Sequence, residues 1–210
     1  MIKAVIFDMD GVLIEAKDWH FNALNKALSL FGYEISRFEH LTTYDGLPTS
    51  RKLEMLTIEH GLPKELHEFI NEMKQRYTME IIHAQCKPRF THEYALSQLK
   101  TKGYKLGLAS NSIRSTVEVM LKKACLDSYL DIILTNEDVK YPKPDSEIYI
   151  KAIDLLGLLP GETLIVEDNE NGIKAAKASG AHVLVVRDVE EANIKNIMAK
   201  ILEVEGDVIR

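Results

Sequence analysis

The stretch VIFDMDGVLIE, residues 5–15, runs from apolar residues directly into two carboxylates. Asp8 and Asp10 are separated by one residue, so in an extended segment their side chains point to the same side of the chain. A buried carboxylate without a partner is costly, so these acids require either an exposed strand end or a compensating cation. Both alternatives place Asp8 and Asp10 at the mouth of a sheet, where Gly11 lets the chain turn.

Polar side chains also follow three later apolar runs: Ser110 with Asn111, residues 136–138, and Glu167 with Asp168. Ligands of open α/β sheets bind outside the carboxyl ends of the strands, so we expect the acids of the first and fourth runs to converge. Converging carboxylates need a counter-ion, and ligand sets made only of oxygen favour a hard cation such as Mg²⁺.

Lys143 lies in YPKPD, between two prolines that stiffen the loop, and supplies a second fixed positive charge. Together with the polar strand ends it makes a set suited to phosphoryl transfer. In such a set Asp8 attacks phosphorus, the cations neutralise the phosphoryl oxygens, and Asp10 manages the proton of the leaving group.

The elements that must position these residues follow a regular alternation of short apolar runs and helical patterns. Continuous apolar strands that alternate with helices indicate a parallel sheet covered on both faces, so the expected fold class is α/β, doubly wound. The expected strands are 3–8, 104–110, 131–135, 163–168 and 182–186, and the expected helices are 91–103, 112–126, 146–157 and 171–181.

The alternation stops between residues 16 and 86, where the pattern is helical throughout. An ordinary crossover between parallel strands needs one helix, so a helical segment of this length is a domain of its own. We therefore expect a Rossmann-like catalytic core formed by residues 1–15 and 87–210. Residues 16–86 are expected to form a small all-helical cap inserted after the first strand.

Four motifs carry a resemblance to a known family: DMDGV, ASNS, KPD and VEDNENGIKAAKASGA. Their order and spacing resemble the four sequence motifs of the haloacid dehalogenase-like superfamily. The helical segment resembles the C1-type cap of the branch that contains β-phosphoglucomutases and small-molecule phosphatases. The resemblance implies that Asp8 is a nucleophile forming an aspartyl phosphate and that Asp10 is the general acid and base.

The same resemblance implies that Ser110, Asn111 and Lys143 bind the transferring phosphate. It also implies a Mg²⁺ site made by Asp8, the backbone carbonyl of Asp10, and Asp168. Glu167 is open between a direct metal ligand and a residue behind the ligands. Ser110 and Asn111 have a second interpretation as caps of a helix beginning near Ser112, which is compatible with phosphate binding.

Candidate substrate contacts in the cap are His20, Gly46, Arg51, Lys74 and Arg76. His20 stands where β-phosphoglucomutases also carry a histidine, and its alternative is a packing role on the helix face. Each cap cation has the alternative of a solvated helix face. Monomer and weak homodimer both remain open, because apolar cap positions can pack internally or against a partner.

Bulk composition excludes several classes of function. The formal net charge of -6 argues against a nucleic-acid backbone as the main partner. No apolar run approaches the roughly 18 residues of a membrane helix, and the first residues do not follow a signal-peptide layout, so a cytoplasmic protein is expected. The two cysteines indicate neither a disulfide framework nor a zinc site.

The leading hypothesis is a Mg²⁺-dependent phosphatase of a small phosphorylated metabolite, such as a sugar or polyol phosphate. The alternative is a mutase of the β-phosphoglucomutase type, which returns the phosphoryl group to another hydroxyl of the sugar. A dehalogenase needs neither Asp10 nor a metal, and a non-enzymatic phospho-receiver has no need of a cap.

Overall fold

The computed structural model describes residues 1–207, and the chain forms two compact units. The core unit combines Met1–Glu15 with the chain from Lys87 onward, and the helical insert is Ala16–Cys86. The insert therefore interrupts the core unit directly after its first strand. The expected fold class, an α/β sheet with an all-helical insertion, is confirmed.

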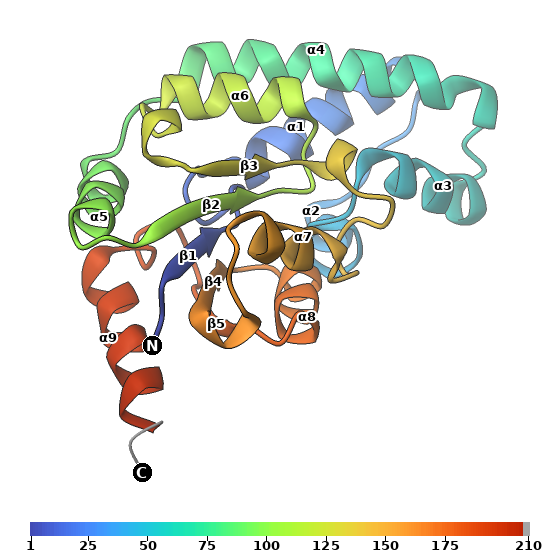
Figure 1. Ribbon diagram of the computed structural model, residues 1–210. Helices are drawn as coiled ribbons and strands as arrows, with labels where there is room; N and C mark the ends of the chain where they lie inside the picture. The colour runs from blue at the N-terminus through green and yellow to red at the C-terminus, as the bar shows by residue number, and fades with distance from the viewer. Residues whose placement is uncertain (208–210) are drawn as a thin grey trace. The chain divides into compact units, whose positions relative to one another are not determined.

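The core unit is built on a five-stranded parallel sheet with strand order β3-β2-β1-β4-β5 (Figure 1). Phe7 pairs with Leu108 on one side and Val166 on the other. The residues that follow these three positions therefore lie side by side at the carboxyl edge of the sheet. The strands are β1 (Ala4–Phe7), β2 (Lys105–Ala109), β3 (Ile132–Leu134), β4 (Thr163–Glu167) and β5 (His182–Val185).

Helices of the core unit bury both faces of the central strand, because all four residues of β1 are inaccessible to solvent. On one face, Ala4 and Ile6 pack with Ile148 and Tyr149 of one helix and with Ala175 of another. This packing fixes the helices α7 and α8 against the strands that carry the polar ends. The helices are α5 (Phe90–Thr101), α6 (Arg114–Lys123), α7 (Glu147–Leu155), α8 (Glu170–Ala178) and α9 (Ile194–Asp207).

The helical insert has an apolar centre of its own, to which Leu24, Leu28, Leu53 and Ile70 contribute. Two of its helices, α1 and α4, pack against each other. The insert consists of α1 (Lys17–Leu28), α2 (Arg37–Glu39), a π-helix (His40–Tyr44), α3 (Thr49–His60) and α4 (His67–Gln85), with short 3₁₀ turns at Ser29–Phe31 and Lys64–Leu66.

Gly172 marks an unusually close approach between α8 and the end of β4. A β-carbon added at Gly172 would lie 1.8 Å from Glu167 Oε1 and 2.1 Å from its carboxyl carbon. Glu167 is buried and hydrogen-bonded, so its carboxylate has no room to move aside. Glycine at this position lets the helix start directly against the carboxylate.

His40 is a buried imidazole in the π-helix of the insert, only 2% exposed, with the Phe21 ring 4.8 Å away. The pKa of His40 is lowered from 6.5 to about 4, mainly by burial. The nearby Lys52 ammonium also lowers this pKa, and its effect is larger than the opposite effect of the Asp45 carboxylate. Folding therefore favours the neutral imidazole.

Replacing Gly172 with alanine is expected to reduce the free energy of unfolding by about 2 kcal/mol, because the new methyl group must displace a fixed carboxylate. Gly161 is a matched control, since a β-carbon there meets nothing within 4 Å and Gly161→Ala is expected to be nearly neutral. Urea titration of both variants measures the difference. Equal stabilities would show that Glu167 moves freely.

His40 is expected to make the insert acid-sensitive. Since its folded pKa of about 4 lies below the unfolded value of 6.5, stability is complete above pH 6.5 and falls as the pH drops toward 4, by up to about 3 kcal/mol. His40→Phe should flatten this pH dependence, whereas His83→Phe, at an exposed position of α4, should not.

Urea unfolding followed by fluorescence reports on the insert, because Trp19 in α1 is the single tryptophan of the chain. Identical slopes of stability against pH in the wild type and His40→Phe would contradict the assignment.

Candidate active site

The site is organised around Asp8, the first residue after the central strand. Asp8 is 8% exposed, and its backbone N–H continues the ladder by donating to Val166 O at 3.0 Å. Lys143 Nζ lies 2.6 Å from Asp8 Oδ1, so the two residues form a buried ion pair. The polar end of β1 is thus held in place by a cation supplied from a distant loop.

Lys143 is itself fixed at both its side chain and its backbone. Its ammonium also donates to Ala109 O at 2.8 Å and to Glu167 Oε1 at 2.7 Å. Asn111 Oδ1 accepts from the backbone N–H of Lys143 at 3.0 Å, and Asn111 Nδ2 donates to its carbonyl at 3.1 Å. Asn111 was expected to contact phosphate, and in the structure its side-chain amide holds the lysine loop.

Asp10 sits on a tight turn that follows the strand. Gly11 has a φ of +93°, a conformation natural to glycine, and its N–H donates to Ile14 O at 2.7 Å. Ser112 Oγ donates to Asp10 Oδ2 at 2.8 Å, which orients the carboxylate. Asp10 and the loop after β2 are therefore tied together.

The loop after β2 corrects one sequence-based interpretation. The helix begins at Arg114, two residues after Ser112, and its cap residue Ile113 makes no side-chain capping bond. Ser110 is 1% exposed, and its Oγ accepts from the backbone N–H of Ser112 at 3.1 Å. Ser110 and Asn111 therefore do not cap this helix, because Ser112 and Ile113 lie between them and its first residue.

Glu167 lies at the end of β4 with both carboxylate oxygens in hydrogen bonds. Oε1 accepts from Lys143 Nζ and from Tyr149 OH, the latter at 2.6 Å. Oε2 accepts from the backbone N–H groups of Asp168 and Asn169, at 3.0 Å and 3.3 Å. Gly172 of α8 lies directly against this carboxylate, so the carboxylate is closely packed.

Burial and charge compete at these groups. Burial raises the pKa of Asp8 well above its usual value; Lys143 lowers it, while Glu167, Asp168 and Asp10 raise it. Burial acts to lower the pKa of Lys143, but Asp8 and Glu167 outweigh it and raise the pKa overall. The lysine is therefore charged at neutral pH. Its ammonium pairs with Asp8 and Glu167, while the carboxylates of Asp168 and Asp10 add further negative charge around Asp8.

The excess of carboxylates makes the site suitable for a cation. Ligand oxygens of Asp8, Glu167 and Asp168 lie within 4.8 Å of one another. This donor set contains only carboxylate oxygen, which suits Mg²⁺ or another hard divalent ion and is poorly suited to softer metals. The residues present therefore fit the cation that the sequence indicates.

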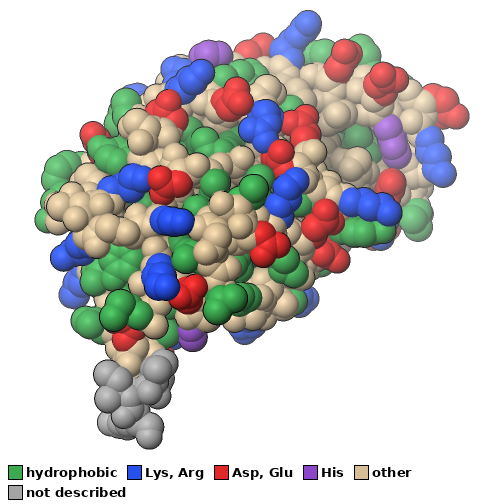
Figure 2. Space-filling model, viewed as in Figure 1, with side chains coloured by type: hydrophobic (Ala, Val, Ile, Leu, Met, Phe, Trp, Pro, Cys, Tyr) green, Lys and Arg blue, Asp and Glu red, His purple; other side chains and the backbone are tan. Residues whose placement is uncertain are grey.

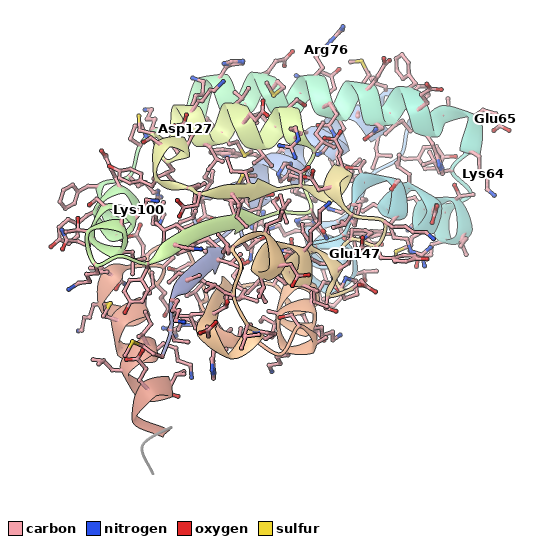
Figure 3. All side chains as sticks on the ribbon, in the orientation of Figure 1. Lys64, Glu65, Arg76, Lys100, Asp127 and Glu147 are labelled. Atoms are coloured by element: carbon pink, nitrogen blue, oxygen red, sulfur yellow. The ribbon has the colours of Figure 1, made fainter. Side chains whose placement is uncertain are left out.

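Two of the cap candidates contact each other inside the insert, and two others are exposed on its surface. His20 and Lys74 meet within the insert, with 3.3 Å between His20 Nδ1 and Lys74 Nζ, and Lys74 is buried. Arg51 is exposed and pairs with Glu54 at 2.8 Å, which matches the solvated-face alternative. Arg76 points outward from α4 and is exposed (Figure 3). Gly46 occupies a turn with a φ of +71°.

Two polar residues of the site, Ser112 and Tyr149, were not predicted from the sequence. Ser112 comes directly after Ser110 and Asn111, and only the loop conformation shows that its hydroxyl reaches Asp10. Tyr149 lies in the otherwise apolar buried face of α7, and a polar tip among the buried residues Ile148, Ala152 and Ile153 was the available signal.

The surface gives no indication of a highly charged partner on the face that is visible. Lys and Arg side chains are interspersed with Asp and Glu there (Figure 2). Among residues 1–207, no helix combines the length and the apolar character needed to cross a membrane. Cys86 is buried and Cys125 is exposed.

Comparison with known proteins identifies the family of the chain. The family model described as haloacid dehalogenase-like hydrolase matches residues 5–186. Over 182 residues the chain is 30% identical to a phosphorylated carbohydrates phosphatase of Thermotoga maritima, covering 85% of this chain and 82% of that protein. Over 195 residues it is 29% identical to the pyrophosphatase PpaX of Bacillus mycoides, covering 88% and 83%.

Among solved structures, a β-phosphoglucomutase from Clostridium difficile shares the fold with a TM-score of 0.85, over 100% of both chains and at 22% identity. The resemblance indicated by the four sequence motifs is confirmed. The chain belongs to the haloacid dehalogenase-like hydrolase family.

Proposed function

We propose that this hydrolase is a Mg²⁺-dependent phosphatase of small phosphorylated metabolites, with sugar or polyol phosphates as the preferred class. The observation that carries the proposal is the buried Asp8–Lys143 pair at 2.6 Å, set among oxygen ligands at the carboxyl edge of the sheet. A carboxylate nucleophile beside a fixed ammonium is the arrangement that phosphoryl transfer requires.

In this mechanism Asp8 attacks phosphorus and the ester P–O bond of the substrate breaks, which leaves the phosphoryl group on the carboxylate. Asp10 protonates the departing alkoxide and then removes a proton from the water that hydrolyses the aspartyl phosphate. Ser112 holds the Asp10 carboxylate in one orientation through its 2.8 Å hydrogen bond. Lys143, Ser110 and the loop at Asn111 stabilise the phosphoryl oxygens.

Asp8, the backbone carbonyl of Asp10, and Asp168 would hold Mg²⁺. When bound, the ion supplies positive charge to the phosphoryl oxygens and reduces repulsion between the anionic nucleophile and an anionic substrate. Glu167 is assigned a supporting role, because both of its oxygens already accept hydrogen bonds from Lys143, Tyr149 and two backbone N–H groups.

Support for the substrate class comes from the relatives and from the insert. The named relatives act on phosphorylated carbohydrates and on pyrophosphate. We assign substrate selection to the helical insert as a cap domain, with the His20–Lys74 pair as its candidate contact. A histidine and a lysine can donate hydrogen bonds to hydroxyl or anionic groups of a small metabolite.

Phosphorus NMR tests the function. The protein is incubated with Mg²⁺ and a mixture of sugar, polyol and short-acid phosphates and pyrophosphate, including β-glucose 1-phosphate with a trace of glucose 1,6-bisphosphate. Growth of inorganic phosphate at the expense of one compound supports a phosphatase and identifies its substrate. A new ester that appears without free phosphate would instead assign a mutase.

Asp8→Asn is expected to lower turnover at least about a thousandfold, because the amide cannot form the aspartyl phosphate. Asp127→Asn is the matched control, since Asp127 is an exposed carboxylate of the core unit (Figure 3). Its activity should equal that of the wild type. Turnover by Asp8→Asn at the wild-type rate would refute the nucleophile assignment.

Removal of divalent ions with a chelator is expected to abolish hydrolysis, and Mg²⁺ should restore it. Asp168→Asn should raise the Mg²⁺ concentration for half-maximal activity at least about tenfold, because it removes a ligand charge. Asp154→Asn, an exposed position of α7, should leave the Mg²⁺ requirement unchanged. Full activity in the chelator would exclude the metal assignment.

A further inference from the structure

Tyr149 joins the two charged residues that surround Asp8. It lies in α7, its side chain is inaccessible to solvent, and its hydroxyl donates to Glu167 Oε1 at 2.6 Å. The face of its ring lies under the ammonium of Lys143, with 4.7 Å from Nζ to the ring centroid. One side chain therefore contacts both members of the Lys143–Glu167 pair.

The hydroxyl of Tyr149 completes the hydrogen bonding of a buried carboxylate. Glu167 Oε1 has two donors, Lys143 and Tyr149, and Oε2 has two backbone donors. A carboxylate offers about four acceptor positions, so Glu167 is fully satisfied within the protein. Loss of one donor leaves a buried charge less well compensated and removes one of the contacts that fix the carboxylate beside Lys143.

The ammonium of Lys143 is equally constrained. Its three N–H groups have three acceptors, on Asp8, Ala109 and Glu167, at 2.6–2.8 Å. A rotation of Glu167 therefore shifts the lysine relative to Asp8. Displacements of about 1 Å in a reacting group are enough to cost a hundredfold in rate.

We infer that Tyr149 is a positioning residue for phosphoryl transfer, which acts by fixing Glu167 and Lys143 around Asp8. The inference rests on the proposed function, because it assigns Tyr149 a part in that same reaction. Packing alone does not account for the hydroxyl, since phenylalanine fills the same space and adds no polar group to the apolar surroundings of α7.

The test compares Tyr149→Phe with Tyr44→Phe. Phenylalanine keeps the ring beneath Lys143 and removes only the donor to Glu167. Tyr44 is the control, because it is 1% exposed, packs in the apolar centre of the helical insert and donates its hydroxyl to the exposed Glu59 at the same 2.6 Å. Both variants keep the ring and lose one hydrogen bond from a tyrosine hydroxyl to a carboxylate, which is buried at Tyr149 and part-buried at Tyr44. A change in kcat and in the fluorine spectrum that occurs only in Tyr149→Phe is therefore specific to the site.

Two measurements are made on each folded variant with the substrate found by phosphorus NMR. The first is the separation of kcat from KM. The second is the fluorine NMR spectrum of the protein with Mg²⁺ and beryllofluoride, a mimic of the phosphoryl group on Asp8. The spectrum reports the surroundings of the fluorines without turnover, and its intensity gives the concentration of competent sites.

For Tyr149→Phe we expect kcat per competent site to fall about tenfold, equivalent to about 1.4 kcal/mol, with KM changed less than about twofold. The fluorine resonances should shift, because Lys143 is displaced. Tyr44→Phe should show the kcat and the spectrum of the wild type.

A Tyr149→Phe protein with the kcat and fluorine spectrum of Tyr44→Phe would overturn the inference and leave the phosphatase proposal standing. A wild-type protein that hydrolyses no phosphate compound and binds no beryllofluoride would overturn both. The two failures are therefore distinguished by the wild type alone.

Discussion

The buried contact between Lys143 and the carboxylates of Asp8 and Glu167 is the interaction on which the rest of the core unit depends. Removing three charges from water is costly, and the cost is offset only when the geometry is close and the remaining donors and acceptors are satisfied. The surrounding structure meets these conditions. Breaking the set by removing one partner would leave an uncompensated charge inside the protein.

Much of the local architecture is explained by that requirement. The parallel register aligns the ends of β1, β2 and β4, so Asp8, Ala109 O and Glu167 all reach the ammonium. Asn111 clamps the backbone of Lys143. Gly172 gives the Glu167 carboxylate space that any side chain would occupy. Apolar packing of α7 and α8 then holds these parts in position.

The charge balance of the site also connects structure with chemistry. One ammonium among four carboxylates leaves the Asp8 pKa raised by burial and by its acidic neighbours. A divalent cation held by these oxygen ligands would offset that imbalance and would favour the ionised form of Asp8, which the proposed mechanism requires. The helical insert has its own apolar centre, and in it the half-buried His20 lies 3.3 Å from the buried Lys74.

The sequence by itself determined the fold class, the order of the five strands with the helices α5 to α8 between them, and the motif residues, because apolar periodicity and the order of the motifs depend only on the local chain. The helix α9 was not among the expected helices. The rule for strand ends placed Asp8 near Glu167 and Asp168, and Lys143 was added to them as a positive charge from a proline-flanked loop. Only the tertiary structure decided which oxygen atoms of Asp8 and Glu167 accept hydrogen bonds from Lys143 and Tyr149. The roles of Ser112, Tyr149 and Gly172, and the burial of Lys74 beside the exposed Arg76, depend on side-chain contacts between segments far apart in the chain, which local patterns do not encode.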